Sequence, residues 1–153
     1  MYYYDKKIYD TYTISELFVT NTTYTKGIIE ICNNEEFKVD MSTTKFGSSL
    51  SGVNNVELNK IIIDWGDGTK TKLNRPINHT ISTISNLKED DWKKASHTFN
   101  IDKRNIYLTD DAQFLPKITI KIYSTFNDVV NIIIPYKIVY KSLYDLGTGF
   151  ELL

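Results

Sequence analysis

The sequence predicts an all-β fold in which two sheets pack face to face and one short helix lies in a loop insertion. The first observation is composition: 20 Ile and 17 Thr stand against two Ala, and branched side chains suit strands whereas Ala suits helices. The second is an alternation of apolar and polar residues in several segments. The third is a Gly-Asp-Gly turn that joins two such segments. Together they indicate a β-sandwich.

Length and cysteine content limit how such a domain is stabilised. A chain of 153 residues suits one domain, which buries roughly 70% of its unfolded surface. Cys32 is the single cysteine, so no internal disulfide forms and packing must supply the stability. Cys32 ends the segment Ile-Ile-Glu-Ile-Cys at residues 28 to 32, and in this setting we expect it to be a small buried hydrophobe.

The first half of the chain carries strand patterns in three places. Residues 16 to 32 are expected to hold one or two strands. The run from Phe37 to Met41 alternates apolar and polar residues, and so does the run that contains Ile61, Ile63 and Trp65. A period of two places alternate side chains on one face of a sheet, so each run predicts a half-buried strand.

A single helix is indicated between these strands and the next. Asn86 and Glu89 form a capping box ahead of residues 90 to 95, and this pattern predicts a short helix there. Residues 47 to 52, rich in Gly and Ser, predict a surface loop. They lack the sequence of a phosphate-binding loop and that of a nucleophile elbow.

Two long strands are predicted near the end of the chain. Ile118, Ile120 and Ile122 alternate with polar residues, which is typical of a half-buried strand. A second run covers residues 130 to 141. It contains Pro135, which removes a donor from the ladder, and we therefore expect this strand to lie at a sheet edge or to contain a bulge.

A tight hairpin connects the strand that ends at Asp64 to a polar returning strand. Glycine at positions 66 and 68 permits a positive φ, and the Asp67 carboxylate can accept hydrogen bonds from the turn. The motif residues are Asp64, Trp65, Gly66, Asp67, Gly68, Thr69 and, further along, His97. This segment is the clearest local signal in the sequence.

At these residues the chain resembles the PKD domain, an immunoglobulin-like module with the signature Trp-Asp-Phe-Gly-Asp-Gly-Thr followed by His-x-Tyr. Residues 63 to 69 match the first element in five of seven places, and residues 97 to 99 match the second with Phe for Tyr. Residues 116 to 122 have the alternation of the family's last motif but lack its Gly and Tyr. The resemblance implies an immunoglobulin-like (PKD-like) β-sandwich and says little about function.

The polar motif residues are expected to have structural roles. We interpret Asp67 as a turn former; the alternative is a calcium ligand joined by Asp64, Asp110 and Asp111 in the fold. His97 is expected to be a hydrogen-bonded structural histidine. Two histidines and one cysteine supply too few ligands for a usual zinc site, and we expect no metal and no cofactor.

The distribution of charge excludes some partners. Residues 1 to 76 carry nine Lys/Arg and ten Asp/Glu, and the remainder carries nine of each. Neither a basic nucleic-acid face nor an acidic tail is indicated. The N-terminal residues lack the pattern of a secretory signal, and no stretch approaches the ~18 apolar residues of a membrane span. We therefore expect synthesis in a host cytoplasm, with no nucleic-acid or membrane partner.

The two ends of the chain are the predicted partner-binding regions. We expect a Tyr-rich N-terminal arm at 1–14, the sandwich at 15–141 and a C-terminal tail at 142–153. Tyrosine is enriched at protein interfaces, and six of the 11 tyrosines lie in the first 24 residues. The predicted contact residues are Tyr2, Tyr3, Tyr4, Tyr9, Phe150 and Leu152. The alternative, that both ends fold back on their own domain, stays open.

These features favour a binding protein over an enzyme. The sequence shows no pattern for a nucleophile with its base, for a carboxylate pair, for a set of metal ligands or for a phosphate-binding loop. We expect a structural protein of a tailed-phage virion, such as a capsid decoration or a head or tail accessory protein, whose partners are other virion proteins in a symmetric multi-copy assembly. Two alternatives are a bacterial cell-surface adhesion or carbohydrate-binding module and an intracellular adaptor.

Overall fold

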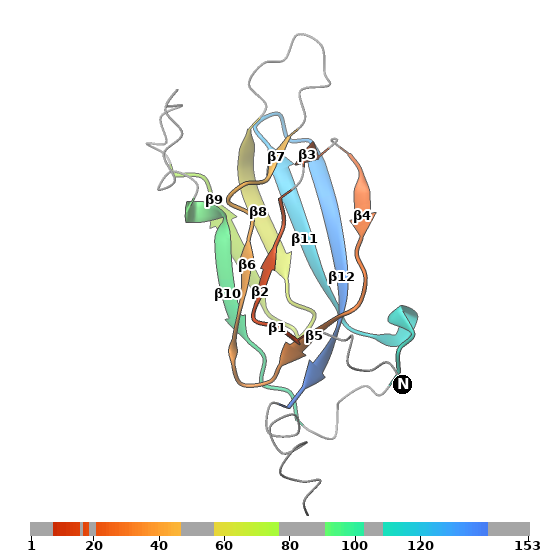
Figure 1. Cartoon of the computed structure of the whole chain (residues 1–153). Coiled ribbons are helices and arrows are strands. Elements are labelled where there is room, and N and C mark those ends of the chain that lie inside the picture. Colours follow the sequence, from red (N-terminus) through yellow and green to blue (C-terminus); the bar gives the residue numbers. More distant parts are fainter. Residues whose placement is uncertain are drawn as a thin grey trace, which may run out of the picture.

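The computed structural model describes residues 8–15, 17–18, 21–46, 57–76, 91–102 and 109–140, and strands dominate this part of the chain (Figure 1). The strands are β1 (Ile8–Tyr9), β2 (Thr11–Thr13), β3 (Leu17–Phe18), β4 (Thr23–Thr25), β5 (Ile29–Cys32), β6 (Glu36–Asp40), β7 (Lys45–Phe46), β8 (Leu58–Asp64), β9 (Lys70–Asn74), β10 (Lys94–Thr98), β11 (Lys117–Ser124) and β12 (Val129–Val139). A 3₁₀ helix, η4 (Ala112–Phe114), precedes β11. The prediction of an all-β fold is confirmed.

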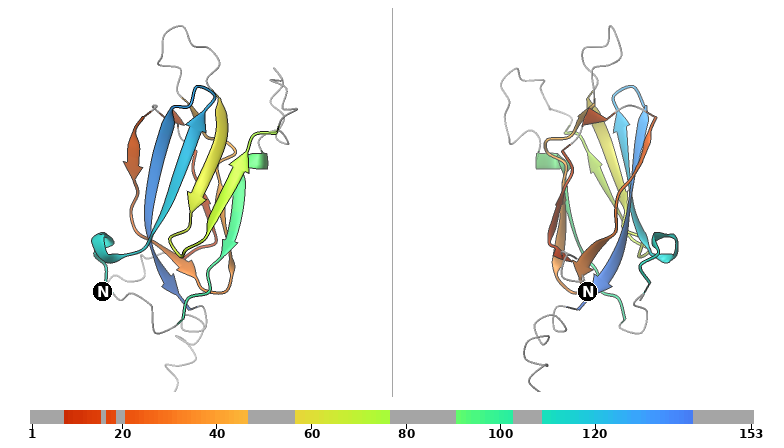
Figure 2. Two further views of the ribbon diagram at one scale, coloured as in Figure 1. Left: turned by 180° about the vertical axis from the view of Figure 1, so that it is seen from behind. Right: turned by 45° about the vertical axis from the view of Figure 1, so that its right-hand side comes forward.

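The strands of the described residues form two sheets that face each other and one small additional pair. The large sheet has the order β1-β5-β12-β11-β8-β9, with β4 paired to β12, and the other has the order β10-β6-β2. Figure 2 shows the two sheets as separate layers, and β3 pairs with β7 at one end. The strands β8, β9, β11 and β12 pair antiparallel, whereas β4 and β5 lie parallel to β12.

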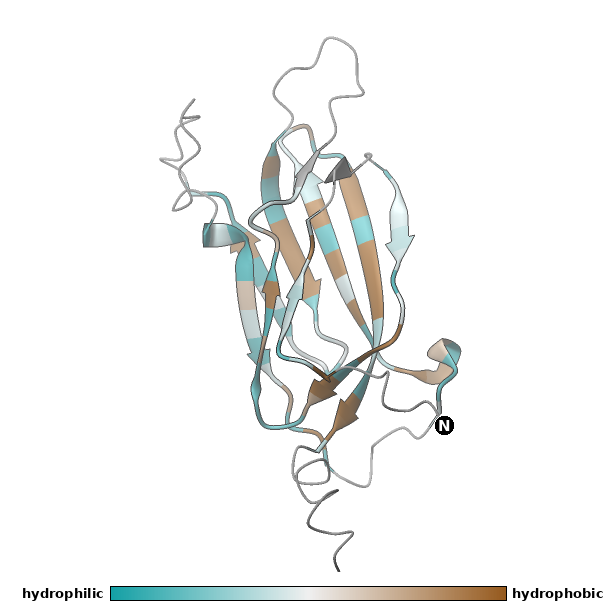
Figure 3. Cartoon of the chain, viewed as in Figure 1, coloured by the Kyte–Doolittle hydropathy of each residue, from teal (hydrophilic) through white to brown (hydrophobic). Residues whose placement is uncertain are grey.

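The core lies between the two layers. From the large sheet it receives Ile61, Ile63, Ile118, Ile120, Ile122, Ile132, Ile134, Tyr136 and Ile138, and from the facing sheet Phe37, Val39 and Ala95. Along β11 hydrophobic and hydrophilic residues alternate (Figure 3), as the period of two predicts. Each fully buried Ile contributes about 1.5 to 3 kcal/mol relative to an exposed one. Cys32 is also buried and free, as expected.

Pro135 lies inside the large sheet, so the expectation of an edge strand or a bulge is wrong. On one side β12 pairs with β11 in unbroken register from Lys117 to Tyr123. On the other side Asn131 to Ile133 pair with β4, and Tyr136 to Val139 pair with β5. Pro135 falls between these two pairings. Its missing N–H therefore costs no ladder hydrogen bond, because the neighbouring strand changes at that position.

Two further expectations need correction. Residues 8 to 13, assigned from the sequence to an N-terminal arm, form β1 and β2, which pair with β5 and β6. The predicted helix over 90–95 is wrong at its end: a 3₁₀ turn covers residues 91–93, and Lys94 and Ala95 begin β10. Pairing of these two residues with Asp40 and Val39 overrides the local helix signal. The loop at 47–52 and the capping residues 86 and 89 lie outside the described residues.

Candidate functional site

The Gly-Asp-Gly turn between β8 and β9 has the predicted hairpin geometry. Gly66 has a φ of 81° and Gly68 a φ of 92°. The Asp64 Oδ1 accepts a hydrogen bond from the Gly66 N–H at 3.0 Å, and the Asp67 Oδ1 accepts one from the Thr69 N–H at 3.0 Å. The Thr69 hydroxyl also donates to Asp67. The turn is therefore held by side chains that bond backbone groups two residues further on.

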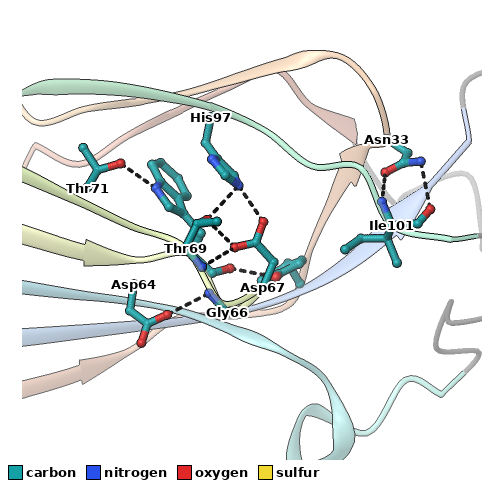
Figure 4. A network of polar contacts seen from close by, with 10 residues as sticks. Asn33, Asp64, Gly66, Asp67, Thr69, Thr71, His97 and Ile101 are labelled. Carbon is teal, nitrogen blue, oxygen red and sulfur yellow. Dashed lines mark hydrogen bonds and ion pairs between the residues drawn. The ribbon is translucent and has the colours of Figure 1, made fainter.

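His97, on β10 of the facing sheet, is bound to this turn. Its Nε2 lies 2.7 Å from the Asp67 Oδ2 (Figure 4). The two side chains are only 16% and 11% exposed, so solvent screens the contact less than it screens a surface pair. The contact connects the hairpin of one sheet to a strand of the other, and His97 is a hydrogen-bonded histidine as predicted.

The pKa of Asp67 is lowered from its ordinary value. Burial by itself raises this pKa, but hydrogen bonds from the Thr69 hydroxyl, from His97 and from the Thr69 backbone, together with the charge of His97, outweigh that effect. Hydrogen bonds donated to a carboxylate favour its ionised form. Asp67 is therefore a carboxylate at neutral pH, and His97 faces a negative charge.

An aromatic cluster fixes the other side of His97. Its ring stacks on Trp65 at 4.7 Å between centroids with an interplanar angle of 10°, and the Phe99 ring lies perpendicular to it at 4.6 Å between centroids. Trp65 is fully buried; its Nε1 donates to the Thr71 hydroxyl at 2.8 Å, and its carbonyl accepts from the Tyr136 hydroxyl at 2.7 Å. We call Trp65, Asp67, Thr69, His97 and Tyr136 the hairpin clamp.

The hairpin clamp does not have the geometry of a nucleophilic triad. In such a triad the histidine binds the acid through one ring nitrogen and the nucleophile through the other. Here Asp67 and the Thr69 hydroxyl both approach Nε2 of His97, at 2.7 and 3.4 Å. In this arrangement His97 does not accept the Thr69 proton on one ring nitrogen while Asp67 orients the ring through the other. What these contacts can do is hold the two sheets in register.

The acidic residues considered as calcium ligands have separate partners. Asp110 forms an ion pair with Lys137 at 2.7 Å, and the Asp111 carboxylate caps η4 by accepting from the Gln113 N–H at 3.0 Å. Asp64 and Asp67 each bond their own turn. Among the described residues, no group of three or more His, Cys, Asp or Glu is placed to hold a metal ion.

Of the predicted partner-binding residues the structure describes Tyr9. It lies half-buried in β1, with its ring 5.5 Å from that of Tyr12, and it lines a hollow of about 160 Å³. The other five, Tyr2, Tyr3, Tyr4, Phe150 and Leu152, lie outside the described residues. The described residues also contain no helix with the length and apolarity that crossing a membrane requires.

Two members of the site were missed in the sequence. Thr71 accepts the indole hydrogen bond of Trp65, and Tyr136 binds the Trp65 carbonyl from a strand 71 residues away. The alternation in β12 assigns Tyr136 to the buried face, but which strand faces it depends on pairing between distant segments. A buried Tyr needs a hydrogen-bond partner for its hydroxyl. This requirement is the signal in the sequence that points to a contact of Tyr136.

Comparisons of the chain with protein-family models, with curated proteins and with solved structures found no match. The likeness to the PKD domain therefore rests on the sequence pattern, above all on residues 63–69 and 97–99. The structure brings these two segments together through Asp67 and His97.

Proposed function

We propose that this chain is a non-enzymatic structural protein that acts through protein–protein contacts, as a virion component of a bacteriophage, in the role of capsid decoration or of a head or tail accessory protein. The observation that carries the proposal is the hairpin clamp. Its Asp, His and Thr side chains, which in an enzyme would be candidates for acid–base work, bond one another and the turn. These groups stabilise the fold and leave binding as the role of its surfaces.

An immunoglobulin-like, PKD-like sandwich is the fold that we propose for this role. The order β9-β8-β11-β12 corresponds to the C′-C-F-G order of variable-type immunoglobulin sheets. The position of His97 against the Gly-Asp-Gly turn adds support, since both segments belong to the PKD signature. The parallel pairing of β4 and β5 with β12 joins the N-terminal part of the chain to the final strand of the sheet.

The absence of a disulfide suits this proposal. Cys32 is buried and free, and stability comes from a core of branched residues between the sheets. A domain of this kind folds in a reducing cytoplasm, where virion proteins are made before assembly.

Purification of virus particles from cells that express the chain tests the proposal. We expect the chain to remain with the particles through successive purification steps. A glycan array separates the carbohydrate-binding alternative: specific binding to one class of glycan, combined with absence from particles, would replace the virion role by that of an adhesion module.

A further inference from the structure

Strand β4 forms an outer edge of the large sheet. Figures 1 and 2 show it at the periphery of the molecule, with β12 beside it. Its Thr22 carbonyl accepts a hydrogen bond from β12, and its Lys26 N–H donates one to β12. Successive residues of a strand direct their backbone groups to opposite sides. The N–H and C=O groups of Thr23 and Thr25 therefore point away from β12.

These outward backbone groups have no partner among the described residues. On that side of β4 no described strand is paired with it, and the side chains of Thr23 and Thr25 are exposed. A free row of backbone N–H and C=O groups is a template on which another strand can pair. We call the outward side of Thr23 and Thr25 the β4 edge.

The other edge strands of the two main sheets are less suited to pairing. β9 carries Lys70 and Lys72, and β10 carries Lys94; lysine on an edge strand opposes pairing with a further chain. β1 has only two residues. β2 has the same Thr-Tyr-Thr sequence as β4, but in Figure 1 the strands β11, β12 and β4 of the large sheet extend past it. Among these strands, β4 has the uncharged edge that a second molecule can reach.

We infer that two copies of this chain associate through their β4 edges, as antiparallel strands related by a two-fold axis at Tyr24, so that the large sheet continues from one copy into the other. Thr23 of one copy is then directly opposite Thr25 of its partner, and the two residues exchange hydrogen bonds in both directions. The same surface is used by both copies, so the contact closes as a dimer. The inference rests on the proposed assembly function and names a second copy as the partner.

The β4 edge favours this register over its neighbours. An axis at Thr23 would place Thr25 opposite Asn21, whose φ of 59° is outside the extended region that a strand needs. An axis at Thr25 would place Thr23 opposite Gly27, beyond the end of β4. With the axis at Tyr24, both threonines of each copy find an extended partner.

The side chains also suit this register. Lys26 of each copy lies opposite Thr22 of its partner, so the pairing avoids the like charges that destabilise cross-strand neighbours. The two Tyr24 side chains, which pack against the core of their own copies, meet across the axis, and aromatic cross-strand pairs are stabilising. A contact made by one short strand buries less than the ~1,200 Å² of a standard interface. The dimer is therefore weak and forms at high protein concentration.

Sedimentation equilibrium of the full chain, at concentrations up to about 1 mM, tests the inference with two charged variants. Thr23→Lys with Thr25→Lys sets lysine opposite lysine in the antiparallel pair and weakens the association about tenfold or more. Thr23→Lys with Thr25→Glu sets lysine opposite glutamate and preserves the association. In a parallel pairing of two β4 strands this second variant would oppose like charges, so its behaviour reports the direction of pairing.

The Thr-Tyr-Thr sequence of β2 supplies a matched control. Thr11→Lys with Thr13→Lys makes the same change of charge at exposed positions of β2, and it leaves the association intact. Equal melting temperatures for all variants exclude misfolding as the cause of lost association.

A wild type that stays monomeric throughout this concentration range overturns the inference. Equal weakening by the β2 control, or dissociation of the lysine–glutamate variant, overturns it as well. A monomeric chain that is nevertheless recovered in virus particles overturns the dimer and leaves the proposed function standing. A dimer that the lysine–lysine variant dissociates, in a chain absent from particles, supports the β4 contact and overturns the particle role.

Discussion

The His97 Nε2 lies 2.7 Å from the Asp67 Oδ2 across 30 residues of chain, and this contact joins the hairpin of the large sheet to β10 of the facing sheet. The surrounding Trp65 and Phe99 rings allow the imidazole little freedom. The residues that resemble the PKD signature therefore form a polar contact between the two layers, beside the apolar core. Their substitution should change stability before it changes any surface property.

The Asp67 carboxylate should make stability depend on pH in the acid range. Its folded pKa lies below the ordinary value of about 3.9, so its contribution is fully present above that value and is lost as pH falls through the folded pKa. We expect the melting temperature of the wild type to fall more steeply below about pH 4 than that of Asp67→Asn. Asp10→Asn, at an exposed position outside the hairpin clamp, serves as the control and should keep the wild-type slope. Parallel curves for wild type and Asp67→Asn would contradict the role of the clamp.

The two turn glycines should differ in their tolerance of a side chain. A Cβ at Gly68 would meet open space, so Gly68→Ala costs only the positive-φ strain, about 1 kcal/mol. A Cβ at Gly66 would lie 2.5 Å from the Lys117 carbonyl oxygen, so Gly66→Ala adds a clash and should cost about 3 kcal/mol or more. Urea unfolding of both variants measures the difference. Equal losses would show that the turn does not pack on β11 as described.

Removal of the Tyr136 hydroxyl should destabilise the fold. Tyr136 is buried and its hydroxyl donates to the Trp65 carbonyl at 2.7 Å, so Tyr136→Phe leaves a buried acceptor without this partner. The expected loss is about 1 to 3 kcal/mol in the free energy of unfolding. Tyr123→Phe, on the outer face of the same sheet, is the matched control and should change little. A loss that is no greater for Tyr136→Phe would remove this residue from the clamp.

Deletions at the two ends should separate assembly from folding. Because β1 pairs with β5, an N-terminal deletion must stop at residue 7 if it is to spare the sheet. We expect deletion of residues 1–7 or of 142–153 to leave the melting temperature nearly unchanged and to reduce incorporation into particles, since these segments contain five of the predicted contact residues. A large fall in melting temperature, with incorporation following the amount of folded protein, would instead assign both ends to the core.

The sequence predicts those parts of the fold that depend on local periodicity. The alternation around Ile120 identifies a half-buried strand because the period of two is a property of the strand itself. The position of Pro135 was predicted wrongly, because the neighbour of β12 changes from β4 to β5 at that residue. Lys94 was predicted to be helical, but cross-strand pairing with Asp40 decides its conformation.

The charges on the surface also depend on pairing between distant strands, which local sequence patterns do not reveal. Lysines and acids are spread evenly along the chain, and on that basis no basic face was expected. In the fold, strand pairing brings Lys72 and Lys121 to either side of Ile62 although 49 residues separate them in the chain. The arrangement of charges from distant strands becomes visible only when the register between those strands is known.

The proposed function is tested most directly by counting copies of the chain in virus particles. Quantitative mass spectrometry across a density gradient gives the ratio of the chain to the main shell protein in each fraction. We expect a constant ratio through the particle band, because a component built into a regular assembly has a fixed number of copies per particle. A chain that stays with the unassembled proteins, or whose ratio falls steadily across the particle band, would contradict it.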